Sequence, residues 1–201
     1  MDFADSSDIE QALSLVGEIL AAEGQSYSVC ILGGAALNLL GIVSRTTTDV
    51  DILAFTSPGS NRTGRPELVE PPEPIPEPLQ DAVRQVARDK NLDPHWLNTG
   101  PALQWKAGLP DGLATRVTWR DYAALRVGIV SRYDLIFFKL FAAVDSKGTS
   151  SGHYNDLLAL QPSSRELAEA AAWVGTQDAS PSFATVLEMV VTHLGQNLAH
   201  G

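Results

Sequence analysis

The first part of the chain combines a helical hydrophobic pattern with a strand-like one. Residues 8–23 carry apolar side chains at spacings of three and four, which predicts an amphipathic helix. We expect this helix to begin at a capping box formed by Ser7 and Glu10 and to end at Gly24. The next run, Tyr27–Leu32, is largely apolar and predicts a strand.

A short helix and a second strand are expected next. Residues 35–41, AALNLLG, predict a helix that ends at a glycine, and residues 49–55, DVDILAF, predict a strand. A strand places alternate side chains on opposite faces. Asp49 and Asp51 are therefore expected to project together, while the apolar residues next to them face the core.

The middle of the chain is less regular. Residues 57–78 hold seven of the twelve prolines and no hydrophobic period, so we expect a surface loop or mobile flap rather than a packed element, with an inert linker as the alternative. A helix is predicted near residues 79–90, and residues 114–119 and 124–130 are rich in strand-forming side chains.

The last third of the chain is helical in pattern. After Ser131, four stretches in succession carry helical apolar spacing, and no internal repeat is visible. We therefore predict an α+β fold, with a small mixed sheet and flanking helices over residues 1–130. Residues 131–201 are expected to form a C-terminal helical part that packs on this core.

Charge and composition narrow the functional classes. The net charge is −10, which argues against a general DNA or RNA binder. Residues 81–147 nevertheless carry 10 Lys+Arg against 7 Asp+Glu, so a basic face for a phosphate-bearing substrate stays open. The acidic N-terminus, the lack of a membrane-spanning run and the single cysteine favour a cytoplasmic protein.

The glycine pair and the two aspartates suggest a phosphate site. Two parallel carboxylates repel each other unless a cation lies between them, and Mg²⁺ is commonly held by one or two carboxylates plus substrate phosphates. Gly33 and Gly34 follow a predicted strand, where backbone N–H groups can approach phosphate oxygens closely. The alternative is a turn glycine pair beside two solvated aspartates of an edge strand.

These segments resemble a known superfamily. "LGG" followed by "DVDI" resembles the hG[GS]…Dh[DE]h motif of nucleotidyltransferases with the DNA polymerase β-like fold. "GGAALNLLGIVSRTTTDVDIL" resembles its minimal bacterial branch, which includes AbiEii-like and MenA-type toxin nucleotidyltransferases. "DLIFFKLFAAVDSKGTSSGHYNDLLAL" resembles the downstream helix pair of that branch, in which a lysine and an aspartate complete the site.

The resemblance implies a role for each matching residue. Gly33 and Gly34 would hold the nucleotide phosphates, and Asp49 and Asp51 would bind Mg²⁺ or Mn²⁺. Arg45 would lie near the phosphates or brace the strand. Lys139 would contact the triphosphate, and Asp156 would lie at the substrate end. Each of these three also has a structural alternative: a surface ion pair, a lysine reaching solvent from an apolar helix, and a helix-start aspartate.

The chain departs from the family pattern at the third carboxylate. Residues 114–119 and 124–130 contain none, and Asp111 and Asp121 only flank the first run. The site is then either minimal, with Asp156 as a substitute, or able to bind a nucleotide without turning it over. Asn98 either faces the cleft or belongs to a turn with the following Thr-Gly.

The resemblance implies Mg²⁺-dependent transfer of a nucleoside monophosphate from an NTP such as ATP, with release of pyrophosphate. The implied acceptor is RNA or protein, and the implied setting is a toxin–antitoxin or phage-defence system with a cognate toxin or antitoxin partner. The alternative is a catalytically silent nucleotide-binding module, or an antitoxin-like interaction module, of the same fold.

Overall fold

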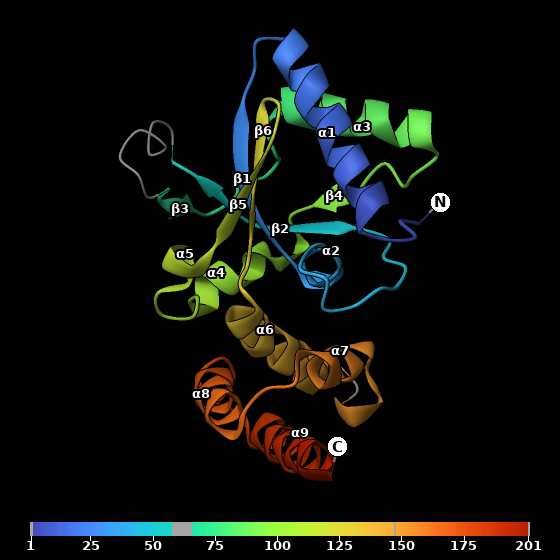
Figure 1. The fold of residues 1–201 in the computed structure, drawn as a ribbon. Coiled ribbons are helices and arrows are strands. Elements are labelled where there is room, and N and C mark those ends of the chain that lie inside the picture. Colours follow the sequence, from blue (N-terminus) through green and yellow to red (C-terminus); the bar gives the residue numbers. More distant parts are fainter. Residues whose placement is uncertain (1, 58–65, 147, 201) are drawn as a thin grey trace. The chain divides into compact units, whose positions relative to one another are not determined.

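The structure is a computed structural model that describes residues 2–57, 66–146 and 148–200. The chain divides into two compact units. The first unit comprises Met1–Lys106 and Gly112–Ser131, and the second comprises Ala107–Asp111 and Arg132–Gly201 (Figure 1). The predicted α+β class is confirmed, because a mixed sheet with helices is followed by a run of helices.

The first unit is built on a six-stranded mixed sheet with the order β3-β2-β1-β6-β5, and β4 pairs with β2. The pairs β1–β6 and β2–β4 are parallel, and the other pairs are antiparallel. The strands are β1 (Tyr27–Leu32), β2 (Val50–Thr56), β3 (Leu68–Val69), β4 (Leu97–Asn98), β5 (Thr118–Tyr122) and β6 (Leu125–Ile129).

The central strands of this sheet are covered on both faces. Residues 29–32 of β1 and 52–55 of β2 are buried without alternation, which is the pattern of strands with apolar cover on each side. Strands β3 and β4 pair with opposite ends of β2: β3 pairs with Phe55 and Thr56, whereas β4 pairs with the end that carries Asp51.

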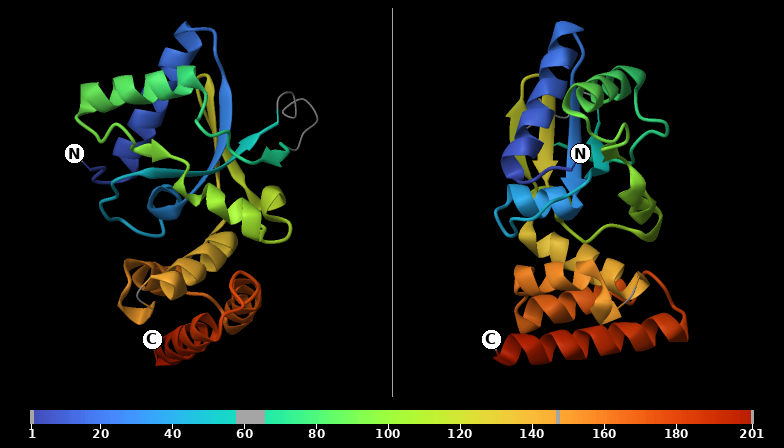
Figure 2. Two further views of the ribbon diagram at one scale, coloured as in Figure 1. Left: turned by 180° about the vertical axis from the view of Figure 1, so that it is seen from behind. Right: turned by 90° about the vertical axis from the view of Figure 1, so that its right-hand side faces the viewer.

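Helices flank the sheet. Helix α1 packs on β5 and β6 and lies beside α3, as both views of Figure 2 show. The helices of this part of the chain are α1 (Ser6–Ala22), α2 (Gly33–Leu39), α3 (Glu77–Lys90), the 3-10 helix η2 (Gly100–Leu103), α4 (Gln104–Ala107) and α5 (Leu113–Arg116).

The elements around the glycine pair match the prediction closely. The strand Tyr27–Leu32 is confirmed with the predicted bounds. Helix α2 begins at Gly33, two residues before the predicted start, so both glycines belong to its first turn. Strand β2 begins at Val50, which leaves Asp49 immediately before the strand.

The predicted cap of the first helix is wrong. The side chain of Asp5, not that of Ser7, accepts hydrogen bonds from the backbone N–H groups of Ser7 and Asp8. The capping box of Ser7 with Glu10 therefore does not form, because an aspartate two residues earlier already satisfies the exposed donors of the first turn. The helix also ends two residues before Gly24.

The expectation for residues 57–78 is wrong in part. Residues 58–65 lie outside the described residues. Leu68–Val69 form a short strand, where β3 pairs with Phe55 and Thr56 of β2. The returning chain thereby satisfies backbone groups along one edge of β2, a long-range partner that local composition does not reveal.

Two further boundaries differ from the prediction. The helix expected over residues 79–90 begins at Glu77, because Pro78 is well tolerated in the first turn of a helix. In the run 114–119, residues 114–116 belong to helix α5, so strand β5 begins only at Thr118.

The second unit is helical, as predicted. Its elements are α6 (Arg132–Asp145), the 3-10 helix η3 (Gly148–Ser150), α7 (Gly152–Leu160), α8 (Ser164–Val174) and α9 (Pro181–His200). Phe137 and Phe138 of α6 both contact Trp173 of α8, with ring centroids 5.9 and 5.6 Å apart. Within the described ranges, no helix is long and apolar enough to cross a bilayer.

Candidate functional site

The two aspartates flank the start of β2 on one face. Val50 and Ile52 are fully buried, whereas Asp49 and Asp51 are half-buried. The predicted alternation is therefore confirmed at this end of the strand. Within the part of the chain that the structure describes, no hydrogen bond or ion pair engages the carboxylate of Asp49.

Gly33 lies directly against one of these carboxylates. In the antiparallel pairing of β1 and β2, Leu32 is opposite Asp51, which brings the following glycine to the same place. A Cβ at Gly33 would collide with Oδ2 of Asp51, and the residue has a φ of +80°. Only glycine satisfies both conditions, because it adopts positive φ without strain and has no side chain to clash.

Gly34 lies against the loop that leads into β2. A Cβ at this position would lie 2.8 Å from Oγ1 of Thr47 and 3.6 Å from Nη2 of Arg45. Arg45 is the only Lys or Arg among residues 1–61. The fold places this cation beside Gly33 and Gly34, which together are called the glycine turn below. Gly33, Gly34, Arg45 and Asp51 are thus brought together by the fold.

A residue without a predicted role holds this arrangement. Asn38 of α2 is 3% exposed, and its amide donates hydrogen bonds to the carbonyls of Gly34 (3.2 Å) and Arg45 (3.0 Å). Its Oδ1 accepts a hydrogen bond from the backbone N–H of Arg45 at 3.3 Å. In the sequence Asn38 only interrupts an apolar run, and that interruption is the one local signal of its role.

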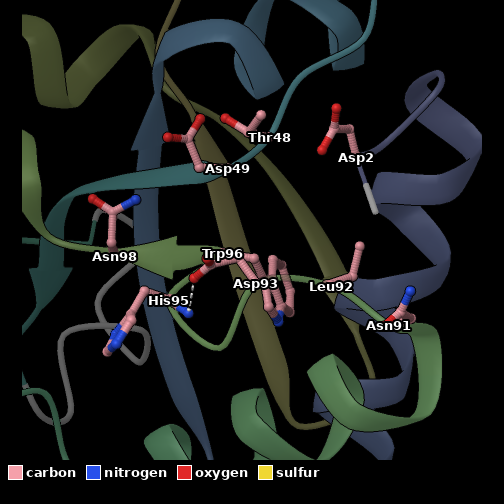
Figure 3. A pocket seen from close by; sticks show the side chains of 9 residues that line it. All are labelled: Asp2, Thr48, Asp49, Asn91, Leu92, Asp93, His95, Trp96 and Asn98. Carbon is pink, nitrogen blue, oxygen red and sulfur yellow. Dashed lines mark hydrogen bonds between the residues drawn. The ribbon is translucent and has the colours of Figure 1, made fainter.

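Asn98 lies next to the aspartates. Strand β4 pairs in parallel with β2, and Asn98 is the register partner of Asp51. Its Oδ1 accepts a hydrogen bond from the N–H of Gly100 at 2.8 Å, and its side chain also lines a cavity that Asp49 borders (Figure 3). The turn contact predicted from the sequence is therefore confirmed, and the same side chain also borders the cavity.

The cavity beside Asp49 has a volume of about 590 Å³ and lies within the first unit. Figure 3 shows its lining residues, which come from the N-terminus, the loop before β2, the segment between α3 and β4, and β4 itself. They are Asp2, Thr48, Asp49, Asn91, Leu92, Asp93, His95, Trp96 and Asn98.

Lys139 and Asp156 lie in the second unit and form an ion pair with each other. Nζ of Lys139 is 2.6 Å from Oδ2 of Asp156, and the two residues are only 6% and 2% exposed. Lys139 therefore does not extend to solvent. Asp156 is in the middle of α7, whose N-cap is Ser151, so the helix-start alternative is wrong.

The donor set on the first unit fits Mg²⁺ with substrate phosphates. Among the described residues, no group of three His, Cys, Asp or Glu side chains is arranged to hold a metal ion. Two carboxylates are enough for Mg²⁺ when phosphate oxygens and water complete the shell. Asp121 does not add a third, because β5 lies at the far edge of the sheet, where this residue pairs with Arg126 at 3.4 Å.

Comparisons with known proteins add one match. No family model matches the chain, and no curated protein matches it. Among solved structures, an antigenic nucleotidyltransferase-like protein from Paracoccidioides brasiliensis is similar, with 17% identity and a TM-score of 0.47 over 94% of this chain and 95% of that one. The function of this chain is therefore to be inferred from its own residues.

Proposed function

We propose that the first unit is a minimal nucleotidyltransferase site that moves a nucleoside monophosphate from an NTP to an acceptor, with release of pyrophosphate. The observation that carries the proposal is the contact between Gly33 and the carboxylate of Asp51, with Arg45 beside the neighbouring glycine. A metal-binding carboxylate, a side-chain-free turn and a cation in one place are what a polyphosphate needs.

The glycine side of the site would hold the phosphates. The missing Cβ of Gly34 leaves room for Thr47, whose Oγ1 lies 2.8 Å from where that Cβ would be, and this close packing brings the guanidinium of Arg45 to the same place. The guanidinium of Arg45 presents several N–H donors in a plane, which suits bidentate contact with a phosphate. The buried amide of Asn38 positions both residues by bonding to the backbone of each.

Asp49 and Asp51 would hold the metal ion. Bound Mg²⁺ would neutralise the charge that develops on the phosphates during transfer. Asp51 is placed next to the glycine turn and Asp49 at the rim of the cavity, so the two carboxylates lie between the proposed phosphate side and the cavity. Such a reaction depends mainly on positioning and on charge neutralisation.

The roles that the family resemblance implies for Lys139 and Asp156, triphosphate contact and substrate-end carboxylate, stay predictions. So do a macromolecular acceptor, RNA or protein, and a role in a toxin–antitoxin or phage-defence system.

A second candidate function is supported by Asn98. The register partner of Asp51 on the neighbouring strand is a neutral amide. A carboxylate there would provide an additional metal ligand and a proton acceptor, and an amide provides neither a negative charge nor a base. A protein with this site could bind a nucleotide without turning it over.

A transfer assay tests the proposal. The protein is incubated with each α-labelled NTP, Mg²⁺ or Mn²⁺, and a cell extract that contains RNA, protein and small molecules. We expect labelled product with the wild-type chain and a loss of about a thousandfold in the Asp49→Ala, Asp51→Ala double variant. Label that persists in this variant would contradict the proposal.

A matched control separates the site from general charge effects. The Glu18→Ala, Asp89→Ala double variant removes the same charge from exposed helix positions and should keep full transfer. The silent alternative predicts no label with any NTP but a raised melting temperature, because a ligand at a hundredfold excess over Kd stabilises the folded state by about 2.7 kcal/mol.

A further inference from the structure

The segment that precedes α1 is attached to the loop before β2. Residues 2–5 are called the N-terminal strap below. The backbone N–H of Phe3 donates to the carbonyl of Thr47 at 2.8 Å, and the N–H of Thr47 donates to the carbonyl of Phe3 at 3.0 Å. Phe3 is 2% exposed, whereas the other three strap residues are exposed. The strap is therefore held to this loop by one mutually bonded backbone pair, and Phe3 is its buried side chain.

The ring of Phe3 packs against a residue that bonds to the start of β2. Its centroid is 5.5 Å from that of Trp96, in an edge-to-face arrangement. Trp96 is fully buried, and its carbonyl accepts a hydrogen bond from the N–H of Val50 at 2.6 Å. Its indole N–H donates to the carbonyl of Val83 at 3.2 Å. Because a close-packed interior transmits displacements, Phe3 supports the first residue of β2 through Trp96.

Thr47 and Val50 are the two backbone anchors on either side of Asp49. Thr47 is 6% exposed, and its Oγ1 lies within hydrogen-bond distance of the carbonyl of Asp49, at 3.5 Å. Val50 is fully buried. Phe3 contacts the first anchor directly and the second through the indole that it packs on. Both anchors of Asp49 thus depend on one residue of the N-terminal strap.

The two proposed metal ligands differ in how their positions are fixed. Asp51 belongs to β2, and its register partners are Leu32 of β1 and Asn98 of β4. Asp49 precedes the strand, and no hydrogen bond or ion pair engages its carboxylate in the described part of the chain. The position of the Asp49 carboxylate is therefore set by the backbone anchors on either side of it.

We infer that Phe3 is a positioning residue for the proposed metal site, because it holds both backbone anchors of Asp49. The inference rests on the proposed function and adds to it a residue from the start of the chain that touches neither metal nor nucleotide. Groups that orient metal ligands from outside the coordination shell commonly change metal affinity by about 10–100-fold when they are removed. Phe3 is therefore expected to act on metal affinity.

The phosphate side of the site is held by a different residue. The backbone N–H and carbonyl of Arg45 are both bonded to the amide of Asn38, which also bonds to the carbonyl of Gly34. Loss of the Phe3 ring should therefore weaken metal binding and leave the binding of metal-free nucleotide unchanged. This division is a readout that a merely structural role of Phe3 would not produce.

Nucleotide binding with and without metal tests the inference apart from catalysis. An ATP analogue with a methylene group in place of the α,β-bridging oxygen is titrated into the full chain by calorimetry, once with EDTA and once with excess Mn²⁺. The ratio of the affinity with Mn²⁺ to the affinity with EDTA reports the contribution of the metal ion. We expect Phe3→Ala to lower this ratio about tenfold and to keep the affinity in EDTA.

Two further variants separate positioning from general destabilisation. Phe3→Leu keeps a large apolar side chain on Trp96 and should restore most of the ratio. Leu20→Ala removes a fully buried side chain from the last turn of α1, away from the strap, and should keep the wild-type ratio. All variants are measured well below their melting temperatures. If Phe3→Ala does not fold, Phe3→Val is expected to show the same loss to a smaller degree.

Hydrogen exchange provides a second readout. In Phe3→Ala, the backbone N–H groups of Thr47 and Val50 should exchange faster, with β1 unchanged. Equal ratios in Phe3→Ala and wild type, equal losses in Phe3→Ala and Leu20→Ala, or a loss of affinity in EDTA as large as that in Mn²⁺ would each overturn the inference.

The Asp49→Ala variant distinguishes this inference from the proposed function. A ratio that falls in Asp49→Ala but not in Phe3→Ala would remove the role of Phe3 and leave the nucleotidyltransferase proposal intact. A wild-type chain that binds the analogue no better with Mn²⁺ than with EDTA would remove the proposed metal site, and the inference with it.

Discussion

Two regions of this protein place the carboxylate of an aspartate against another group, a glycine backbone in one region and a lysine ammonium in the other. In the first unit, Asp51 is half-buried and lies against the backbone of Gly33, and Asp49 borders a cavity. In the second unit, Asp156 is 2% exposed and its carboxylate lies 2.6 Å from the ammonium of Lys139.

The two regions differ in how far each carboxylate is buried and in which group it contacts. A buried ion pair satisfies its own charges, and removing one partner leaves an uncompensated charge in a medium of low dielectric. The carboxylates of Asp49 and Asp51 are only half-buried, and Asp49 borders the cavity. The contrast agrees with the proposal that the glycine and aspartate residues of the first unit form the site, and the ion pair of Lys139 with Asp156 links α6 to α7.

The largest effect that would test this contrast is expected at the buried pair. Lys139→Met should lower the free energy of unfolding by about 3–5 kcal/mol, because Asp156 is left charged and buried. The Lys139→Met, Asp156→Leu double variant should recover most of that loss. Chemical denaturation of the three proteins provides the measurement.

The same variants test the role that the family resemblance implies. If the double variant is stable yet binds ATP many times more weakly than the wild type, Lys139 contacts the nucleotide. The ion pair of the second unit would then belong to the site as well. Unchanged ATP affinity in the stable double variant would limit Lys139 to packing.

A smaller effect is expected at the amide that holds the glycine turn. Asn38→Asp keeps an acceptor for the N–H of Arg45 but replaces the two donations to the carbonyls of Gly34 and Arg45 by repulsion. We expect a loss of about 1–3 kcal/mol in stability. ATP affinity should fall as well, because the glycine turn loses its anchor.

Asn155→Asp on the exposed side of α7 is the matched control for this change. It adds the same charge in the second unit and should alter neither melting temperature nor ATP affinity. If Asn38→Asp and Asn155→Asp gave equal results, Asn38 would have no positioning role.

The smallest effect is expected from a partly exposed ion pair of the second unit. Arg132 donates a hydrogen bond to Glu166 at 2.7 Å and lowers the pKa of this carboxyl to about 2, with Ser163 contributing. A lowered pKa in the folded state adds stability above the unfolded-state value, and this stability is lost as pH falls toward 2. The gain is on the order of 1 kcal/mol, because Arg132 is 40% exposed.

Glu166→Gln should therefore be less stable than wild type at pH 7, with the difference shrinking between about pH 4.5 and pH 2. Urea denaturation across this pH range measures it. A gap that stays constant with pH would show that the charge of Glu166 does not stabilise the second unit.

The sequence was sufficient for features that depend on neighbouring residues. The strand at Tyr27–Leu32, the glycine turn after it and the alternation of Asp49 and Asp51 with buried residues follow from local period and from backbone freedom. Helical spacing after Ser131 also predicted the second unit as a run of helices.

Tertiary structure decided which of these residues meet. The register of β4 on β2 places Asn98 beside Asp51, and the packing of α6 on α7 pairs Lys139 with Asp156. Asn38 acquires its role only when the loop after α2 returns to it. Hydrophobic periodicity specifies which face of an element is buried, but contacts between distant segments depend on register and packing, which no local pattern encodes.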